Sequence, residues 1–85
     1  MPTVLRVAGY RVLILFGPRE HLPAHVHVVK DDGIAVVQLA QDELPQQTLR
    51  VDGLKRAETA RAEGLVREHS SFLLAEFRRI HGKTR

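Results

Sequence analysis

Apolar and polar residues alternate along the first half of the chain in the manner of β-strands. Residues 3–16, TVLRVAGYRVLILF, are rich in β-branched and aliphatic side chains and are interrupted by Ala8 and Gly9. This pattern predicts a hairpin over 3–16 in which Gly9 supplies a positive φ at the turn. The alternation returns in HVHVV, stops at an Asp-Asp-Gly sequence and resumes as IAVVQLA, which predicts a second hairpin over 25–40. A short edge strand is expected at 49–51, LRV.

From Leu54 onward the apolar residues recur with the period of an α-helix. At about 100° per residue they form one stripe, as a helix lying on a sheet requires. The stripe consists of Ala62, Leu65, Val66, Phe72, Leu73, Phe77 and Ile80. Leu74 falls on the polar face, and the whole pattern predicts one long helix over 54–81. Glycine inside a helix costs roughly 1 kcal/mol relative to alanine, so we expect a bend or a split near Gly64.

The order hairpin, hairpin, helix predicts an α+β fold. The two hairpins form a small antiparallel sheet, and the long C-terminal helix packs on that sheet. The 85 residues contain no repeat and no long linker, so we expect residues 1–85 to form a single domain.

Composition narrows the chemistry that the chain can carry. The absence of cysteine excludes thiolate zinc sites and thiol nucleophiles, and it fits a reducing cytoplasm. No apolar run approaches the roughly 20 residues of a membrane helix, so we expect a cytoplasmic protein without a membrane partner. Thirteen lysines and arginines against ten acidic residues give a net charge of +3, which is compatible with a nucleic-acid partner. The sequence contains no phosphate-binding glycine loop, His-Glu-x-x-His motif or nucleophile elbow.

His25 and His27 are the first candidate site. On a strand they project to the same face with their Cα atoms roughly 6.5 to 7 Å apart. Two imidazoles at this spacing suit acid–base catalysis, and they also suit metal ligation. The same pattern is typical of a half-buried strand whose histidines have only a structural role. No cofactor is expected; a zinc site would need a further ligand, for which His69 on the helix stripe is a candidate.

Arg6 and Arg11 are the second candidate site. If Ala8 and Gly9 form a two-residue turn, Arg6 lies directly opposite Arg11 on one face of the hairpin. Like charges at this distance repel unless an anion joins them, which predicts a phosphate or carboxylate clamp. Salt bridges to acidic residues of the same chain are the alternative. If the arginines share a face with His25 and His27, an RNA-cleaving or phosphate-binding site becomes conceivable.

Three segments carry a resemblance to a known family: MPTVLRVAGYRVLILF, EHLPAHVHVVK and FLLAEFRRIHG. They resemble the small prokaryotic family called domain of unknown function 4160. In that family an Arg-x-x-Gly-Tyr-Arg hairpin precedes a Glu-His-x-Pro-Pro-His-Val-His-Val segment and a terminal helix. Ala24 stands where the family often has a second proline, and Phe77 where it has tryptophan. His69 and Glu76 replace asparagine and a small residue, so the helix face differs from the usual one.

The resemblance implies a function through a partner. Genes of this family look like neighbours of another small family in arrangements similar to toxin–antitoxin pairs. This implies a partner-binding component, with the toxin side as one option, whose partner is a small protein from an adjacent gene or a second copy of the chain. The resemblance supplies no catalytic residues. The positions that match the family's motifs are Arg6, Gly9, Tyr10, Arg11, Glu20, His21, Pro23, His25 and His27. Among them we expect Arg6, Tyr10, Arg11, Glu20 and His21 to bind an anion or the partner.

Two other functions remain open from the residues themselves. One is a small endoribonuclease or phosphate-binding protein in which His25 and His27 act as acid and base and the arginines hold the phosphate. The other is a histidine-based metal-binding protein that uses His25, His27 and His69.

Overall fold

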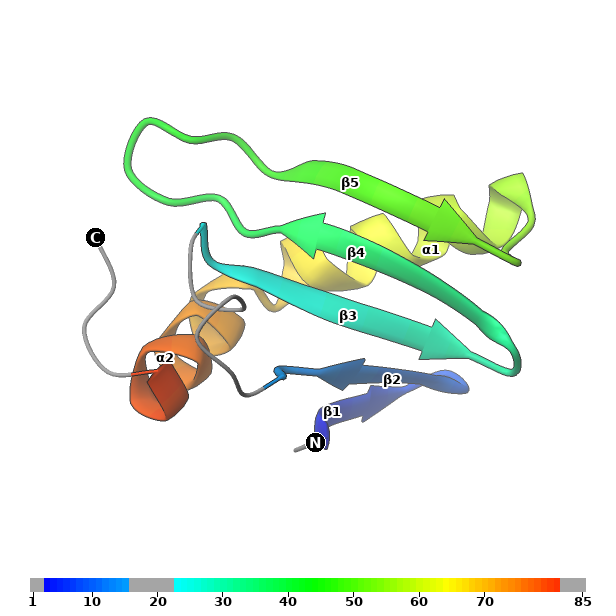
Figure 1. The fold of residues 1–85 in the computed structure, drawn as a ribbon, viewed down its shortest axis with the longest axis horizontal. Helices are drawn as coiled ribbons and strands as arrows, with labels where there is room; N and C mark the ends of the chain where they lie inside the picture. Colours follow the sequence, from blue (N-terminus) through cyan, green and yellow to red (C-terminus); the bar gives the residue numbers. More distant parts are fainter. Residues whose placement is uncertain (1–2, 16–22, 82–85) are drawn as a thin grey trace.

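The computed structural model describes residues 3–15 and 23–81 of the 85-residue chain. Five strands form one antiparallel sheet in the order β1-β2-β3-β4-β5, and two helices follow (Figure 1). The elements are β1 (Thr3–Val7), β2 (Tyr10–Leu13), β3 (His25–Lys30), β4 (Gly33–Gln38), β5 (Gln47–Asp52), α1 (Arg56–Glu68) and α2 (Ser70–His81). The predicted α+β fold, with an antiparallel sheet packed by the C-terminal helical region, is confirmed.

The first hairpin closes with the two-residue turn that its sequence predicts. Val7 pairs with Tyr10 and Arg6 with Arg11, so Ala8 and Gly9 alone connect the strands. Both residues have positive φ, 53° for Ala8 and 84° for Gly9. This combination belongs to the type I′ turn, whose twist matches that of the strands. Ala8 carries a Cβ in the left-handed region, where glycine and asparagine are favoured. The predicted end of this hairpin, residue 16, lies outside the described residues.

The second hairpin turns at Asp31 and Asp32, since Lys30 pairs with Gly33. Asp31 adopts the positive φ, at 53°, whereas Gly33 is the first residue of β4. A Cβ on Gly33 would lie 2.5 Å from the carbonyl oxygen of Gly53. Gly33 is therefore required by the close approach of two backbone segments, and not by the turn itself.

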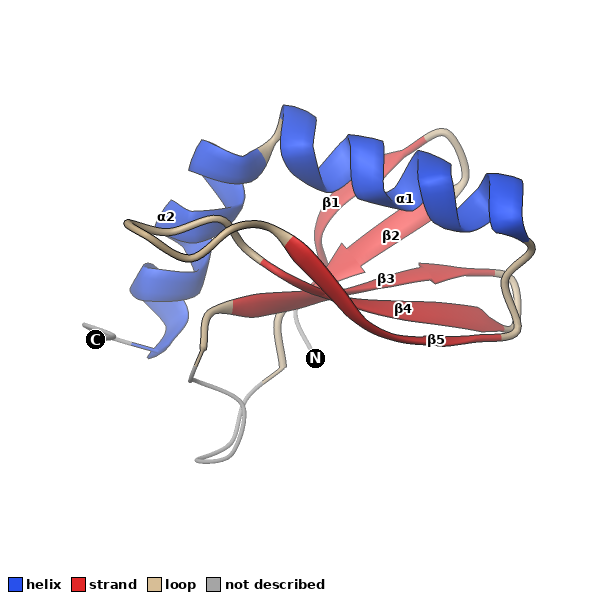
Figure 2. Ribbon diagram, turned by 90° about the horizontal axis from the view of Figure 1, so that it is seen from above, coloured by secondary structure: helices blue, strands red, loops and turns tan. Residues whose placement is uncertain are grey.

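One face of the sheet forms the core against the helices (Figure 2). Val12, Val28 and Ala35 lie opposite one another on three neighbouring strands and are fully buried, as are Val26 and Val37 beside them. Residues of α1 and α2 complete this core; they are Ala62, Leu65, Val66, Leu73 and Phe77. The predicted edge strand at 49–51 is part of the longer β5.

The helical region is divided at His69, so the bend expected near Gly64 is wrong in position. His69 has φ −110° and ψ 21°, and its Nδ1 lies 3.0 Å from the carbonyl oxygen of Leu65. A straight helix over 54–81 would be about 42 Å long, whereas the longest dimension of the molecule is 33 Å. The chain therefore bends where α1 reaches the end of the sheet, and α2 turns down beside that end (Figure 2).

The division at His69 also changes the face on which two residues lie. Phe72, expected on the apolar stripe, is 46% exposed, whereas Leu74, expected on the polar face, packs against the core. Leu73, Phe77 and Ile80 keep their predicted side, so the interruption at His69 shifts the apolar stripe only enough to change residues at its edges. Among the described residues, neither helix combines the length and the apolar character needed to span a lipid bilayer.

Candidate functional site

The sheet surface opposite α1 holds both candidate sites, and we call it the open face. In the described part of the chain α1 does not lie on it, and α2 reaches it only at one end, where Phe77 contacts His25 (Figure 2). Residues directly opposite one another in an antiparallel sheet point to the same side, so the strand pairing arranges this face in three rows. The first row is Arg6, Arg11, Val29, Ile34 and Asp52; the second is Leu13, His27, Val36 and Arg50; the third is His25, Gln38 and Gln47.

Arg6 and Arg11 face each other across β1 and β2, as the turn predicts. Both are exposed, and neither makes a hydrogen bond or an ion pair with a described residue. They line a hollow of about 520 Å³ at the tip of the hairpin, together with Val7, Ala8, Gly9, Tyr10 and Asp31. Asp31 lines the same hollow without forming an ion pair to either guanidinium group. The expected alternative, a salt bridge to an acidic residue of the chain, is not formed by either arginine within the described structure.

Arginine does form ion pairs elsewhere in the described residues. Nε of Arg50 lies 3.1 Å from Oδ2 of Asp52 on β5, where both side chains are exposed. Nη2 of Arg79 lies 2.7 Å from Oε1 of Glu76 on α2, and this hydrogen bond lowers the pKa of Glu76. Both pairs join close neighbours in the sequence. The guanidinium groups of Arg6 and Arg11 therefore differ from these in having their charge uncompensated.

The two histidines lie together on the open face, as the alternation predicts. The ring centroids of His25 and His27 are 5.4 Å apart, and the rings meet at an angle of 61°. Nδ1 of His25 lies 2.8 Å from the carbonyl oxygen of Pro23. A carbonyl oxygen can only accept a hydrogen bond, so this contact places a proton on Nδ1 and leaves Nε2 of a neutral ring as an acceptor.

The histidine pair belongs to a larger ring cluster made of His25, His27, Phe77 and His81. The ring centroids of His25 and Phe77 are 6.0 Å apart, and those of Phe77 and His81 are 4.4 Å apart. Phe77 is fully buried, and so are Nδ1 of His27 and Nε2 of His81. This cluster packs the C-terminal part of α2 against the start of β3. The rings therefore contribute to the packing of α2 on the sheet, and a catalytic use of His25 and His27 stays a prediction.

The sequence analysis does not single out His81 as a member of this cluster, although its spacing from Phe77 indicates that position. It follows Phe77 by four residues, and residues at this spacing lie on the same face of a helix. The side chain of His81 is therefore expected on the side of α2 that carries Phe77.

The described residues give no support to a metal site. No group of three or more histidine, aspartate or glutamate side chains is placed to hold a metal ion within residues 3–15 and 23–81. His69 ends α1, and its ring hydrogen-bonds to the carbonyl oxygen of Leu65. Glu20 and His21, expected to bind an anion or the partner, lie outside the described residues.

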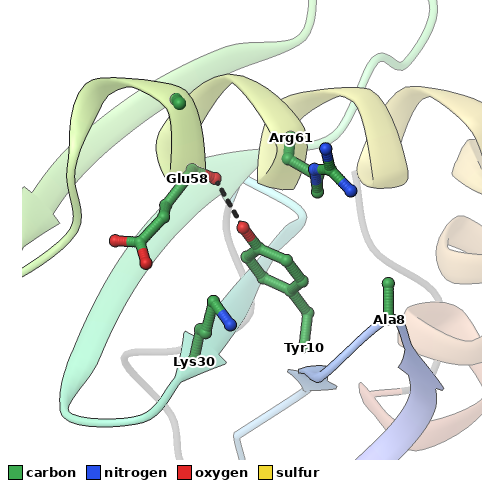
Figure 3. Close-up of a pocket in the computed structure, with 6 residues that line it drawn as sticks. Ala8, Tyr10, Lys30, Glu58 and Arg61 are labelled. Carbon is green, nitrogen blue, oxygen red and sulfur yellow. Dashed lines mark hydrogen bonds between the residues drawn. The ribbon is translucent and has the colours of Figure 1, made fainter.

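Tyr10 lies on the opposite face from its neighbour Arg11. It is 3% exposed, and its hydroxyl group donates a hydrogen bond of 3.2 Å to the carbonyl oxygen of Glu58. Nζ of Lys30 lies 5.3 Å from the centroid of its ring. A pocket of about 280 Å³ beside it is lined by Ala8, Tyr10, Lys30, Ala57, Glu58 and Arg61 (Figure 3). Tyr10 thus joins β2 to the first turn of α1, and it also borders the hollow beside Arg6 and Arg11.

Comparison with known proteins connects this geometry to a family. Residues 9–78 match the family described as Domain of unknown function (DUF4160). The chain belongs to this family. The range matched by DUF4160 includes Arg11, His25 and His27 and begins after Arg6. Searches of curated proteins and of solved structures gave no significant match. Membership of the DUF4160 family confirms the resemblance carried by the hairpin and the histidine segment, and it assigns no activity.

Proposed function

We propose that the chain is a cytoplasmic, partner-binding component of a toxin–antitoxin-like pair, and that its open face binds a small protein encoded by an adjacent gene. The observation that carries the proposal is the asymmetry of the sheet. Helix α1 covers one face, whereas the first row of the open face presents half-buried aliphatic side chains next to exposed arginines.

The aliphatic residues of the open face are contiguous. Val29 lies opposite Ile34 on neighbouring strands, and Val36 follows Ile34 on the same face of β4. All three are partly accessible to solvent. Aliphatic surface that is bordered by charged residues is typical of protein interfaces, in which an apolar centre is surrounded by a polar rim. Arg6, Arg11 and the Arg50–Asp52 pair would form part of that rim.

The dimensions of the open face set a limit on the interface. Five strands about 4.8 Å apart and about 20 Å long present a flat area of about 400 Å². A stable interface of standard size buries about 800 Å² on each partner. The partner must therefore reach beyond the face, and the adjoining surface is the edge strand β5, which exposes Leu49 and, opposite Ala35 on the α1 side, Val51.

Co-purification with the product of the adjacent gene tests this function. We expect one complex at micromolar concentration. The double substitution Val29→Thr, Val36→Thr keeps β-branched side chains but removes apolar surface, and should weaken binding by about tenfold or more if each valine contributes about 1 kcal/mol. Arg67→Gln on the exposed side of α1 is the matched surface control. Two wild-type proteins that elute separately would refute the proposal.

A homodimer is the alternative partner. The edge strand β5 leaves backbone groups available for pairing, and Leu49 and Val51 are 48% and 38% exposed on it. Light scattering of the chain alone separates the two cases. A dimer that becomes a monomer after Val51→Lys would assign this edge to a second copy of the chain.

A second candidate function, endoribonuclease activity, is favoured by one observation. Arg11 lies opposite Val29, and His27 is two residues from Val29 on the same face, so Arg11 and His27 are diagonal neighbours. Diagonal neighbours are roughly 7–8 Å apart, within reach of a long side chain. A phosphate held by Arg6 and Arg11 could then approach an imidazole.

Induction in cells tests this second function. Wild type should arrest growth and cleave RNA, whereas His25→Ala, His27→Ala should not. Because these rings also pack with Phe77, the double variant Arg6→Gln, Arg11→Gln provides a test on exposed residues. Equal growth and intact RNA with wild type and both variants would exclude the activity.

A further inference from the structure

Arg6 and Arg11, at the tip of the first hairpin, form no ion pair with any residue in 3–15 or 23–81 and are available to bind a ligand. Arg6 and Arg11 occupy one end of the first row of the open face, and Val29 and Ile34 follow them in the same row. Side chains directly opposite in an antiparallel pair have their Cβ atoms roughly 4.5–5.5 Å apart. The side chains of the two arginines therefore leave the sheet surface from directly neighbouring positions.

The local electrostatics are unfavourable without an additional anion. Both arginines are exposed, and none of the described acidic residues forms an ion pair with them. Asp31 lines their hollow but does not neutralise either side chain by direct contact. Like charges directly opposite one another destabilise a sheet. An anion with two acceptor oxygens between the guanidinium groups would reverse this effect.

The hairpin fixes the position of Arg6 relative to Arg11. Its turn contains only Ala8 and Gly9, both at positive φ, so the register that places Arg6 opposite Arg11 has little freedom. A site whose groups are already in position loses less conformational entropy when a ligand binds.

We propose that Arg6 and Arg11 clamp a carboxylate group from an acidic segment of the protein partner. This inference rests on the partner-binding function proposed above and specifies the chemistry of the partner. A carboxylate can accept two parallel hydrogen bonds from a guanidinium group, and the planar donors of arginine fit it closely.

The surroundings of the clamp favour a protein over a nucleic acid. The neighbours of the arginines in their row are Val29 and Ile34, which are aliphatic. Arg50, the other arginine among the described open-face residues, is neutralised by Asp52. A nucleic-acid surface combines several uncompensated cations with aromatic side chains on which bases stack. The aromatic rings of the described open face, His25 and His27, are packed in the ring cluster with Phe77 instead.

Affinity for the adjacent gene product at two salt concentrations tests the clamp. We expect the affinity of wild type to fall as salt rises from about 50 to about 200 mM. Arg6→Gln, Arg11→Gln should bind at least tenfold more weakly at low salt and lose most of the salt dependence. The matched control is Arg56→Gln, Arg67→Gln, which removes the same charge from exposed positions of α1 and should retain wild-type affinity. Equal affinities of the clamp variant and the wild type would overturn the inference and leave the proposed function intact.

A second measurement uses the chain without its partner. A short polyglutamate peptide should shift the Nε–H resonances of Arg6 and Arg11 more than those of Arg56 and Arg67. Absence of these shifts overturns the carboxylate clamp, even if the adjacent gene product binds. Tighter binding of a single-stranded RNA oligonucleotide that is lost in the clamp variant would also overturn it, in favour of a nucleic-acid ligand.

Discussion

Gly64 provides a direct test of the helix assignment, because replacing it by alanine should stabilise the protein. Gly64 lies inside α1, and no atom stands within 4 Å of the position that a Cβ would take. Alanine is favoured over glycine in a helix interior by roughly 0.5–1 kcal/mol, since the unfolded chain has less backbone entropy to lose. Unfolding entropies of about 2.1 cal/mol/K per residue give about 0.18 kcal/mol/K for this chain. The expected rise in Tm is therefore about 3–6 °C.

Thermal unfolding followed by circular dichroism measures this change, with urea unfolding as a second determination. Gly33→Ala is the matched control, because it makes the same chemical change where a Cβ would lie 2.5 Å from the carbonyl oxygen of Gly53 and from Cδ2 of Leu54. It should lower stability by about 1–3 kcal/mol, as other overpacking substitutions do. A Gly64→Ala variant that melts at or below the wild-type temperature would refute the reasoning, as would a Gly33→Ala variant of unchanged stability.

Three further predictions concern the turn, the ring cluster and the surface of α2. Ala8→Asn should raise the stability by about 0.5–1 kcal/mol in urea unfolding, because Asn-Gly suits a type I′ turn; a loss of stability would contradict the turn assignment. Phe77→Leu should cost about 1–2 kcal/mol and shift the ring resonances of His25 and His81, whereas Phe72→Ser should stay within about 0.5 kcal/mol; equal costs would contradict the assigned faces of α2. Arg79→Gln should raise the pKa of Glu76 toward the ordinary glutamate value in an NMR titration. Because a lowered carboxyl pKa stabilises the fold above the ordinary value and ceases to do so as pH falls through the lowered one, any advantage of wild type should disappear in acid.

The candidate sites were largely predictable because they depend on short-range geometry. His25 and His27 share a face since side chains alternate along a strand. Arg6 lies opposite Arg11 since a two-residue turn determines the pairing of the strands that it joins. Both relations need only a few consecutive residues, and both agree with the observed pairing.

The errors in the helical region have a different origin. The position of the break depends on the length of the sheet against which α1 packs, and no residue near Gly64 contains that information. The exposure of Phe72 and the partial burial of Leu74 follow from the break. In the same way, Gly33 is needed because the backbone at Gly53 approaches it, a contact between segments that are distant in sequence.

By itself, the sequence determined the strands, their turns and the residues that emerge together from each hairpin. These are properties of the backbone over a few residues. Only the tertiary structure decided which face of the sheet α1 covers. It also decided that α2 brings His81 and Phe77 to His25, and that Arg6 and Arg11 form no ion pair with a described residue. Those outcomes depend on the packing of segments far apart in the chain, where the burial of apolar surface selects the arrangement.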